Sequence, residues 1–524
     1  MAANVANVPS PAGPRPVPSS PEADKGLRRN ALGMVSSVVI GVASTAPAYS
    51  LAATLGFIVA VGGIGLKSPA ILIVSFIPML LIAGSYYYLN RVDPDCGTTF
   101  TWVTRSFGPR TGWVTGWIMV AADVIVMASL AQIAGSYFFL LFGLDSLAAS
   151  TLWTTVAGTV FIAGMTAIAA LGIEISARVQ WFLLAAEVTI LVVISVTALV
   201  RVYGGSAPAT AVKPAASWFV PNMSLGALAG GVLLALFIYW GWDTAVSVNE
   251  ETADKNRTPG VGAVVSTIAL VAIYVLTTTA AQAFRGPDFL AQNANDVLSP
   301  LGTAVFRSST LDKLLILAVL SSSVASTLTT ILPGTRTTLS MAVHRAIPGV
   351  FGRVHPRFQT PLWGTVIYGI ASVAWYVGLT AASQNVLYDS IAALGLMIAF
   401  YYGITGYAVP LFYRHQLLTS AKRFLFLGLF PLLGGLALTW VLIASLDSLW
   451  YPANSESGTS WFGVGPPFVL GVAFILAGVV LMVVAGLHYH EFFSRKRETV
   501  ETMSETPRAT VVGDSVRIEP PKAA

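Results

Sequence analysis

Long apolar segments recur along the whole chain and are separated by short polar loops. Each segment holds about 20 residues, which as an α-helix is enough to cross a hydrocarbon layer about 30 Å thick. The pattern therefore predicts an all-α polytopic membrane protein. About twelve spans are expected, centred on residues 33–61, 69–89, 111–142, 152–171, 179–200, 225–248, 261–284, 314–341, 362–379, 391–412, 424–446 and 464–487.

Two of these spans contain residues that interrupt a helix. In the first span, Pro47 lacks a backbone donor and clashes with the carbonyl of Ala43. In the sixth span, residues 241–243 (GWD) bring a glycine and a carboxylate together at membrane depth. Broken helices at matching positions of two five-helix halves indicate an inverted-repeat transporter. The predicted segments are a transport core at 30–414, with repeats at about 30–203 and 222–414, and two additional transmembrane helices at 415–492.

Composition excludes a soluble protein. Of the 524 residues, 55% are hydrophobic and only 10% are charged, whereas soluble domains carry about 25% charged residues. The single cysteine, Cys96, rules out an intrachain disulfide and supplies no metal-binding spacing, so no metal or cofactor is expected. The net charge of +5 comes from basic residues scattered among short loops, which indicates membrane topology and not nucleic-acid binding.

Polar segments at both ends lie outside the predicted spans. Residues 1–29 are rich in Pro, Ala and Ser and lack the apolar region of a signal peptide, so they are predicted to form a disordered cytoplasmic tail. Residues 493–524 are predicted to form a second one. Lys and Arg gather in the loops on the side of the N-terminus, which predicts a multi-pass protein of the cytoplasmic (inner) membrane with both termini in the cytoplasm.

The two interruptions predict a binding site for a small polar solute. The broken first span is expected to free backbone carbonyls and amides, beside two hydroxyl groups, for a carboxylate and an ammonium. In the sixth span Gly241 lets the chain unwind, and Phe237 lies one turn earlier, where it can close over an amine by cation–π attraction. An ordinary proline kink and simple aromatic packing are the alternatives. The candidate substrate-binding residues are Ala43, Ser44, Thr45, Ala46, Phe237, Trp240 and Gly241.

Three carboxylic residues lie within apolar spans. Glu187 lies deep in the fifth span with no cation within one helical turn. Because low dielectric favours its neutral form, Glu187 is a candidate for binding and releasing a coupling proton; a purely structural, hydrogen-bonded role is the alternative. Asp123 and Asp243 are candidates for pairing with a substrate amine or for an internal hydrogen-bond network.

Two further groups are candidates for ion binding and gating. Ser322 and Ser326 lie on one face of the eighth span and could bind sodium with carbonyls of the first span, although small hydroxyl residues more often permit close helix packing. Glu250, Glu251 and Arg257 follow the sixth span at its predicted cytoplasmic end. They form either a gate salt bridge or a solvated charge cluster.

The chain resembles the amino acid–polyamine–organocation superfamily of permeases over roughly residues 33–414. Three motifs carry the resemblance: residues 237–243 (FIYWGWD) followed by NEET, residues 97–103 (GTTFTWV) followed by FGP, and residues 353–358 (RVHPRF). The resemblance implies a LeuT-like fold, alternating access, and a substrate held between the broken first and sixth helices. It also implies that Phe237 is the gate aromatic and Gly241 the glycine of the unwound segment.

Two positions depart from this family. In several proton-coupled relatives a lysine lies in the fifth span, ten residues after the alanine of an Ala-Arg-x-Gln segment; here residues 177–180 (ARVQ) lead to Glu187. A carboxylate thus replaces an ammonium, so a titratable group is kept while its charge is inverted. The family's glycine-rich signature in the first span is replaced by residues 44–47 (STAP).

These features predict a proton-coupled symporter that imports an amino acid by alternating access. The alternatives are an importer or exchanger of a polyamine or another organic cation, a sodium-coupled carrier, and a sensor without transport. A channel would need a repeated ring of polar residues and an enzyme a metal or nucleophile cluster, and the sequence shows neither. The expected partners are a small-molecule substrate and the lipid bilayer, and the sequence leaves the oligomeric state open.

Overall fold

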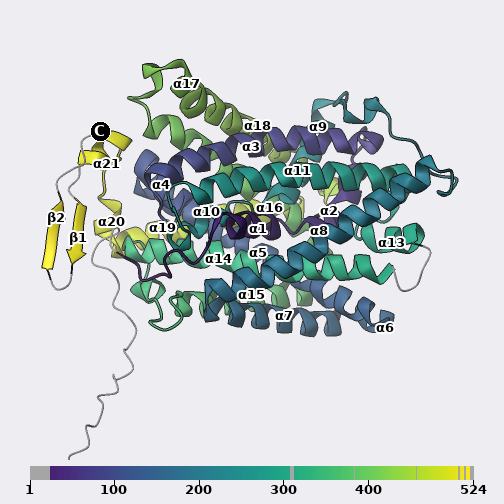
Figure 1. Cartoon of the computed structure of the whole chain (residues 1–524), viewed down its shortest axis with the longest axis horizontal. Coiled ribbons are helices and arrows are strands. Elements are labelled where there is room, and N and C mark those ends of the chain that lie inside the picture. Colours follow the sequence, from purple (N-terminus) through teal and green to yellow (C-terminus); the bar gives the residue numbers. More distant parts are fainter. Residues whose placement is uncertain are drawn as a thin grey trace, which may run out of the picture.

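The computed structural model describes residues 24–306, 312–382, 384–455, 457–505, 508–512 and 515–519. Within these residues, twelve helical segments are long and apolar enough to cross a membrane. The prediction of an all-α polytopic protein with about twelve spans is therefore confirmed. The long helices run mostly along the longest axis of the molecule (Figure 1).

The first ten spans form two groups of five, and the first span of each group is broken. The first group consists of α1 (Met34–Ser44) with α2 (Pro47–Ala60), α3 (Ser68–Val92), α5 (Pro109–Leu141), α7 (Thr151–Leu171) and α8 (Ile173–Tyr203). The second group consists of α9 (Leu225–Tyr239) with α10 (Thr244–Ser247), α11 (Thr258–Arg285), α14 (Asp312–Val343), α15 (Leu362–Ala382) and α16 (Gln384–Phe412). This is the LeuT-like arrangement that the sequence predicts.

Two additional spans and several short elements complete the described chain. The additional spans are α18 (Phe430–Trp450) and α19 (Pro466–His488). The short helices are α4 (Thr99–Phe107), α6 (Asp145–Ala148), α12 (Pro287–Gln292), α13 (Leu298–Phe306), α17 (Ala421–Arg423), α20 (His490–Phe493) and α21 (Val500–Glu505). Strands β1 (Arg508–Val512) and β2 (Ser515–Glu519) pair antiparallel as a hairpin.

The broken spans are buried at the centre of the bundle, whereas several outer helices are largely exposed. Nearly every residue of α2 is buried. By contrast, α8, α15 and α19 expose large apolar side chains, among them Phe182, Ile370 and Leu487. Such a surface is expected where a helix faces lipid tails instead of water. The fold therefore places both helix breaks inside protein, where irregular backbone is tolerated.

Both predicted tails make ordered contacts with the bundle. Residues 1–23 lie outside the described structure, but Lys25 is 4% exposed and contacts Asp95 and Glu250. Near the other end of the chain, Glu498 pairs with Arg105, and α21 and the hairpin follow. The predicted tail boundaries at residues 29 and 493 are therefore corrected, because composition cannot show that these charges find partners on the bundle.

One end of the bundle carries residues 24–33 together with α4 and α20. We call this end of the bundle the terminal end. Figure 1 shows α4, α20, α21 and the hairpin gathered there, with α6 and α13 at the opposite end.

Candidate functional site

The first span breaks where proline prevents the helix from continuing. Helix α1 ends at Ser44, and α2 begins at Pro47, whose missing N–H costs nothing at the first helical position. Between them Ala46 adopts a left-handed conformation, with φ 48° and ψ 66°. The predicted interruption is therefore confirmed, because the helical backbone stops at Ser44 and resumes at Pro47.

The sixth span breaks at the predicted glycine. Helix α9 ends at Tyr239, Trp240 is extended, and Gly241 has a φ of 120°, which side-chain-bearing residues rarely adopt. A single turn, α10, then resumes at Thr244. Both broken helices are thus present at matching positions of the two repeats.

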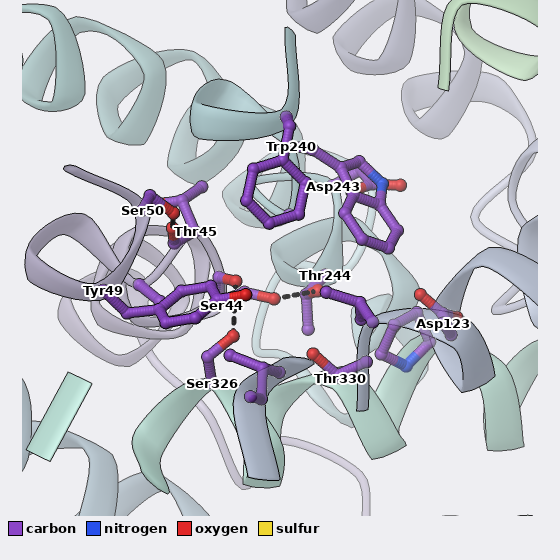
Figure 2. Close-up of a pocket in the computed structure, with 16 residues that line it drawn as sticks. Ser44, Thr45, Tyr49, Ser50, Asp123, Trp240, Asp243, Thr244, Ser326 and Thr330 are labelled. Carbon is purple, nitrogen blue, oxygen red and sulfur yellow. Dashed lines mark hydrogen bonds between the residues drawn. The ribbon is translucent and has the colours of Figure 1, made fainter. Parts of the chain in front are cut away.

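The two breaks touch each other. A Cβ atom on Gly241 would lie 2.6 Å from the carbonyl oxygen of Ser44, so only glycine permits this approach. The Ser44 and Thr244 hydroxyls are 2.7 Å apart, and Ser326 of α14 donates to the Ser44 carbonyl at 3.0 Å (Figure 2). Residues from α1, α10 and α14 therefore meet at one point in the centre of the bundle.

Gly241→Ala is expected to destabilise the protein by about 1–3 kcal/mol, because the new side chain meets a strained φ and the Ser44 carbonyl. The change is measured as a fall in melting temperature of the purified protein. Gly230→Ala is the matched control in the same span, since its Cβ would meet only Val61 at an ordinary 3.8 Å. Equal melting temperatures for the two variants would contradict this account of the contact between the breaks.

Every amide of the first break already has an acceptor. The amides of Thr45 and Ala46 donate to carbonyls three residues earlier, at 3.2 Å each. Pro47 has no N–H. The amides of Ala48 and Tyr49 donate to buried side chains of other helices. Contrary to the expectation from sequence, this break offers no free backbone amide to a substrate carboxylate.

The carbonyls of the first break keep some capacity to accept. The Ala43 carbonyl, which proline was expected to free, accepts from the Ala46 amide, and Ala43 is buried and does not line the cavity. The carbonyls of Ser44 and Thr45 accept one hydroxyl each. Because a carbonyl oxygen has two lone pairs, each can take a second donor. The break therefore presents acceptors.

A cavity lies beside the contact between the breaks (Figure 2). About 370 Å³ between its lining residues is free of protein atoms, and part of that space is open to solvent. Its lining includes every predicted substrate-binding residue except Ala43, together with Asp123 and Asp243. The lining residues are Ser44, Thr45, Ala46, Tyr49, Ser50, Asp123, Val126, Leu130, Phe237, Trp240, Gly241, Asp243, Thr244, Ser326, Thr330 and Pro333.

Two carboxyl groups face this cavity, and no Lys, Arg or His is among its described lining residues. Asp243 is held in place, since Tyr402 donates to its Oδ1 at 2.8 Å and Tyr401 to its Oδ2 at 3.4 Å. Asp123, 4% exposed, has no hydrogen-bond partner for its Oδ2 among the described residues. A buried carboxyl without a partner is costly unless a ligand completes it, so Asp123 is the stronger candidate for receiving a positively charged group.

Aromatic side chains form one wall of the cavity. The ring of Phe237 meets that of Tyr49 edge to face at 6.2 Å between centroids. Trp240 is oriented by a hydrogen bond from its indole to the Tyr401 hydroxyl. Such faces suit a cation or an alkyl chain. Phe237 lines the cavity beside the broken helix, and its role as the gate aromatic stays a prediction.

Glu187 lies outside the cavity, beneath the first turn of α2. Its Oε1 accepts the Ala48 amide at 2.7 Å and the Ser322 hydroxyl at 2.7 Å. Ser322 in turn accepts the Tyr49 amide at 3.1 Å. The Oε2 atom of Glu187 is buried without a partner among the described residues. An acidic group is favoured at a helix start by the exposed amides, so Glu187 of α8 connects the second half of the first span to α14.

The two serines proposed as sodium ligands are engaged in other bonds. The Ser322 hydroxyl donates to Glu187, and the Ser326 hydroxyl donates to the carbonyl of Ser44. Both serines are buried. Ser326 joins α14 to the first span, and Ser322 joins α14 to Glu187, which holds the start of α2. These contacts agree with the helix-packing interpretation of small hydroxyl residues.

The acids at the terminal end pair with cations that sequence reasoning missed. Arg336 of α14 donates to both oxygens of Glu251 at 3.1 Å, and neither side chain is exposed. Lys25 donates to Glu250 at 2.5 Å. Arg257 is exposed and has no ion pair with a described residue, so the predicted pairing through Arg257 is corrected.

Several lining residues were not predicted. Thr330 lies four residues after Ser326, on the same face of α14, and that helical spacing was the available signal. Tyr49 and Ser50 follow the proline in α2, and Thr244 follows Asp243. Their roles depend on which side of each half-helix faces the cavity, which the break itself determines.

Comparison with known proteins identifies the family and several related transporters. A model of the amino acid permease family matches residues 29–475. An uncharacterized transporter of Mycobacterium bovis is 26% identical over 375 residues, which cover 70% of this chain and 76% of that protein. The methylthioribose transporter of Bacillus subtilis is 24% identical over 75% of this chain and 84% of its own. The low-affinity putrescine importer of Escherichia coli is 23% identical over 83% and 92%.

Proposed function

Since this chain belongs to the amino acid permease family, we propose that it is a secondary active transporter that imports an amine-bearing organic cation by alternating access. The observation that carries this proposal is the charge of the cavity: two carboxyl groups and several acceptors face it, and none of its described lining residues is basic. Opposite charge in a low-dielectric site favours an ammonium strongly over a neutral group. Among the relatives, the putrescine importer has a solute of this kind.

An amino acid, the leading prediction from sequence, is the second candidate. One observation favours it: the amides of Gly241 and Trp242 have no hydrogen-bond partner in the part of the chain that the structure describes. Gly241 lines the cavity, so its amide is an available donor for a carboxylate at the second break. The first break lacks such donors, so the carboxylate would depend on the sixth span alone.

The transport cycle we propose couples the cavity to Glu187. The solute's ammonium binds at Asp123, Phe237 closes over its alkyl part, and Glu187 gains or loses a proton as the start of α2 moves relative to α8 and α14. Protonation of Glu187 weakens the acceptor that holds the Ala48 amide. The protonated and ionised forms of Glu187 therefore favour different positions of α2, and this difference between states is what coupling requires. The terminal end faces the cytoplasm in this proposal, as the loop charges predict, and the membrane is the inner membrane.

Matched pairs of solutes that differ only in a carboxylate separate the two candidates. Cadaverine and lysine, agmatine and arginine, and putrescine and ornithine are such pairs. We expect each amine to raise the melting temperature of the purified protein more than its amino acid does, because a ligand at 100 times its Kd stabilises by about 2.7 kcal/mol. Methylthioribose, which has no amine, is expected to have no effect. Stabilisation by the amino acids alone would overturn the first proposal in favour of the second.

A further inference from the structure

The segment before α1 is fastened across the terminal end of the bundle. The amides of Ala31 and Leu32 donate to the Glu251 carbonyl at 2.8 and 3.1 Å, and the Leu32 carbonyl accepts the Ala253 amide at 2.8 Å. We call residues 24–33 the N-terminal strap. Its backbone bonds join the start of the first span to the segment that follows α10, so these parts are constrained to move together.

Lys25 connects the strap to two different elements. Its Nζ lies 2.7 Å from Oδ2 of Asp95, in the turn between α3 and α4, and 2.5 Å from Oε1 of Glu250, which follows α10. Burial disfavours charge on Lys25, but the adjacent Asp95 holds its pKa well above the usual value. Burial likewise opposes the charge on Asp95, yet Lys25 holds the pKa of that carboxyl well below its usual range. The pair is therefore ionised at neutral pH.

Asp95, the partner of Lys25, is held in place by hydrogen bonds from α4, from α14 and from the turn before α4. Its Oδ1 accepts the Gly97 amide at 2.7 Å, the Thr101 hydroxyl at 2.9 Å and the Ser340 hydroxyl at 2.6 Å. Thr101 belongs to α4 and Ser340 to α14. Asp95 is thus held by α4 and α14, whereas the strap is held by the segment after α10. Lys25 bridges the two sides beside the Arg336–Glu251 pair, which joins the same segment to α14.

We propose that Lys25 is a latch that keeps the terminal end of the bundle closed, and that it must leave Asp95 whenever α1 and α10 separate from α14. The N-terminal strap is then a moving part of the transporter. Removing one partner of a buried ion pair leaves an uncompensated charge that favours hydration, so loss of Lys25 favours the open state. This inference does not depend on which solute is carried.

Cys96, the chain's single cysteine, reports directly on the latch. Its Sγ lies 3.5 Å from the Lys25 Nζ and is fully buried. Burial and the nearby Glu250 raise the pKa of this thiol well above its usual value, so it reacts slowly while the latch is closed. In purified full-length protein treated with N-ethylmaleimide, mass spectrometry measures its modification rate. We expect Lys25→Met to increase that rate at least about fivefold, the lower end of typical conformational coupling.

The direction of the change distinguishes a latch from a local charge effect. Lys25 lowers the pKa of Cys96, so removing its charge without opening the bundle would slow modification. Lys25→Arg keeps the charge and Arg28→Gln removes only an exposed ion pair with Glu174, so both are expected to react at the wild-type rate. Lys25→Gln, which also removes the charge but keeps a polar side chain, is expected to raise the rate in the same way and serves if Lys25→Met does not fold. Rates at or below wild type for Lys25→Met, or for Lys25→Gln if that variant replaces it, would overturn the proposal.

Discussion

Glu187→Gln is expected to abolish accumulation of solute against its gradient while leaving solute binding intact. The glutamine carbonyl can still accept from Ala48 and Ser322, so the start of α2 stays anchored, but the side chain cannot exchange a proton. In wild-type proteoliposomes a difference of one pH unit supplies about 1.4 kcal/mol per coupled proton, which sustains about tenfold accumulation. The variant should reach only equal concentrations, measured by radiolabelled amine uptake with the membrane potential clamped at zero.

Two comparisons separate loss of coupling from loss of structure. Exchange of labelled for unlabelled solute needs no net proton movement, so it is expected to persist in Glu187→Gln. Ser322→Ala removes a hydroxyl from the same carboxyl oxygen but keeps the titratable group, so its accumulation should still follow the pH gradient. Wild-type accumulation by Glu187→Gln would exclude Glu187 from the coupling mechanism.

Asp123→Asn is expected to weaken amine binding roughly ten- to 150-fold, because a hydrogen bond to a charged group contributes about 1.5–3 kcal/mol. Asp123 lines the cavity, and its Oδ2 has no partner within the described chain. Isothermal titration calorimetry of the purified protein measures the loss. Without ligand, the variant should melt at the wild-type temperature or above it, since removing an unpartnered buried carboxyl does not cost stability.

Asp243→Asn is the matched control within the same cavity. Its two oxygens are already engaged by Tyr402 and Tyr401, and an asparagine can keep the Tyr402 bond. The expected loss of affinity is therefore smaller, less than about tenfold. If Asp123→Asn binds the amine as well as wild type, or if both variants lose affinity equally, Asp123 is not the principal partner of the ammonium.

The two helix breaks could be predicted from the sequence because their causes are local. Pro47 cannot continue a helix whatever surrounds it, and Gly241 supplies a conformation that few other residues adopt. The spans follow equally directly from runs of apolar residues. The pairing of the two breaks followed from their matching places in the repeat.

The partners of the polar groups could not be predicted because they come from distant parts of the chain. Lys25 lies 70 residues before Asp95 and 225 before Glu250, and nothing in a polar tail distinguishes a lysine that is buried. The Ala43 carbonyl was expected to be free, but the left-handed turn at Ala46 brings an amide back to it. Sequence indicates which groups a break releases and does not indicate which neighbours take them.

A structure determined with the most strongly stabilising amine bound would show whether the solute binds between the two helix breaks. We expect solute density between α1 and α2 on one side and α9 and α10 on the other, with an ammonium nitrogen within hydrogen-bond distance of Asp123. Density for the solute elsewhere, or continuous helices through residues 44–47 and 240–243, would contradict it.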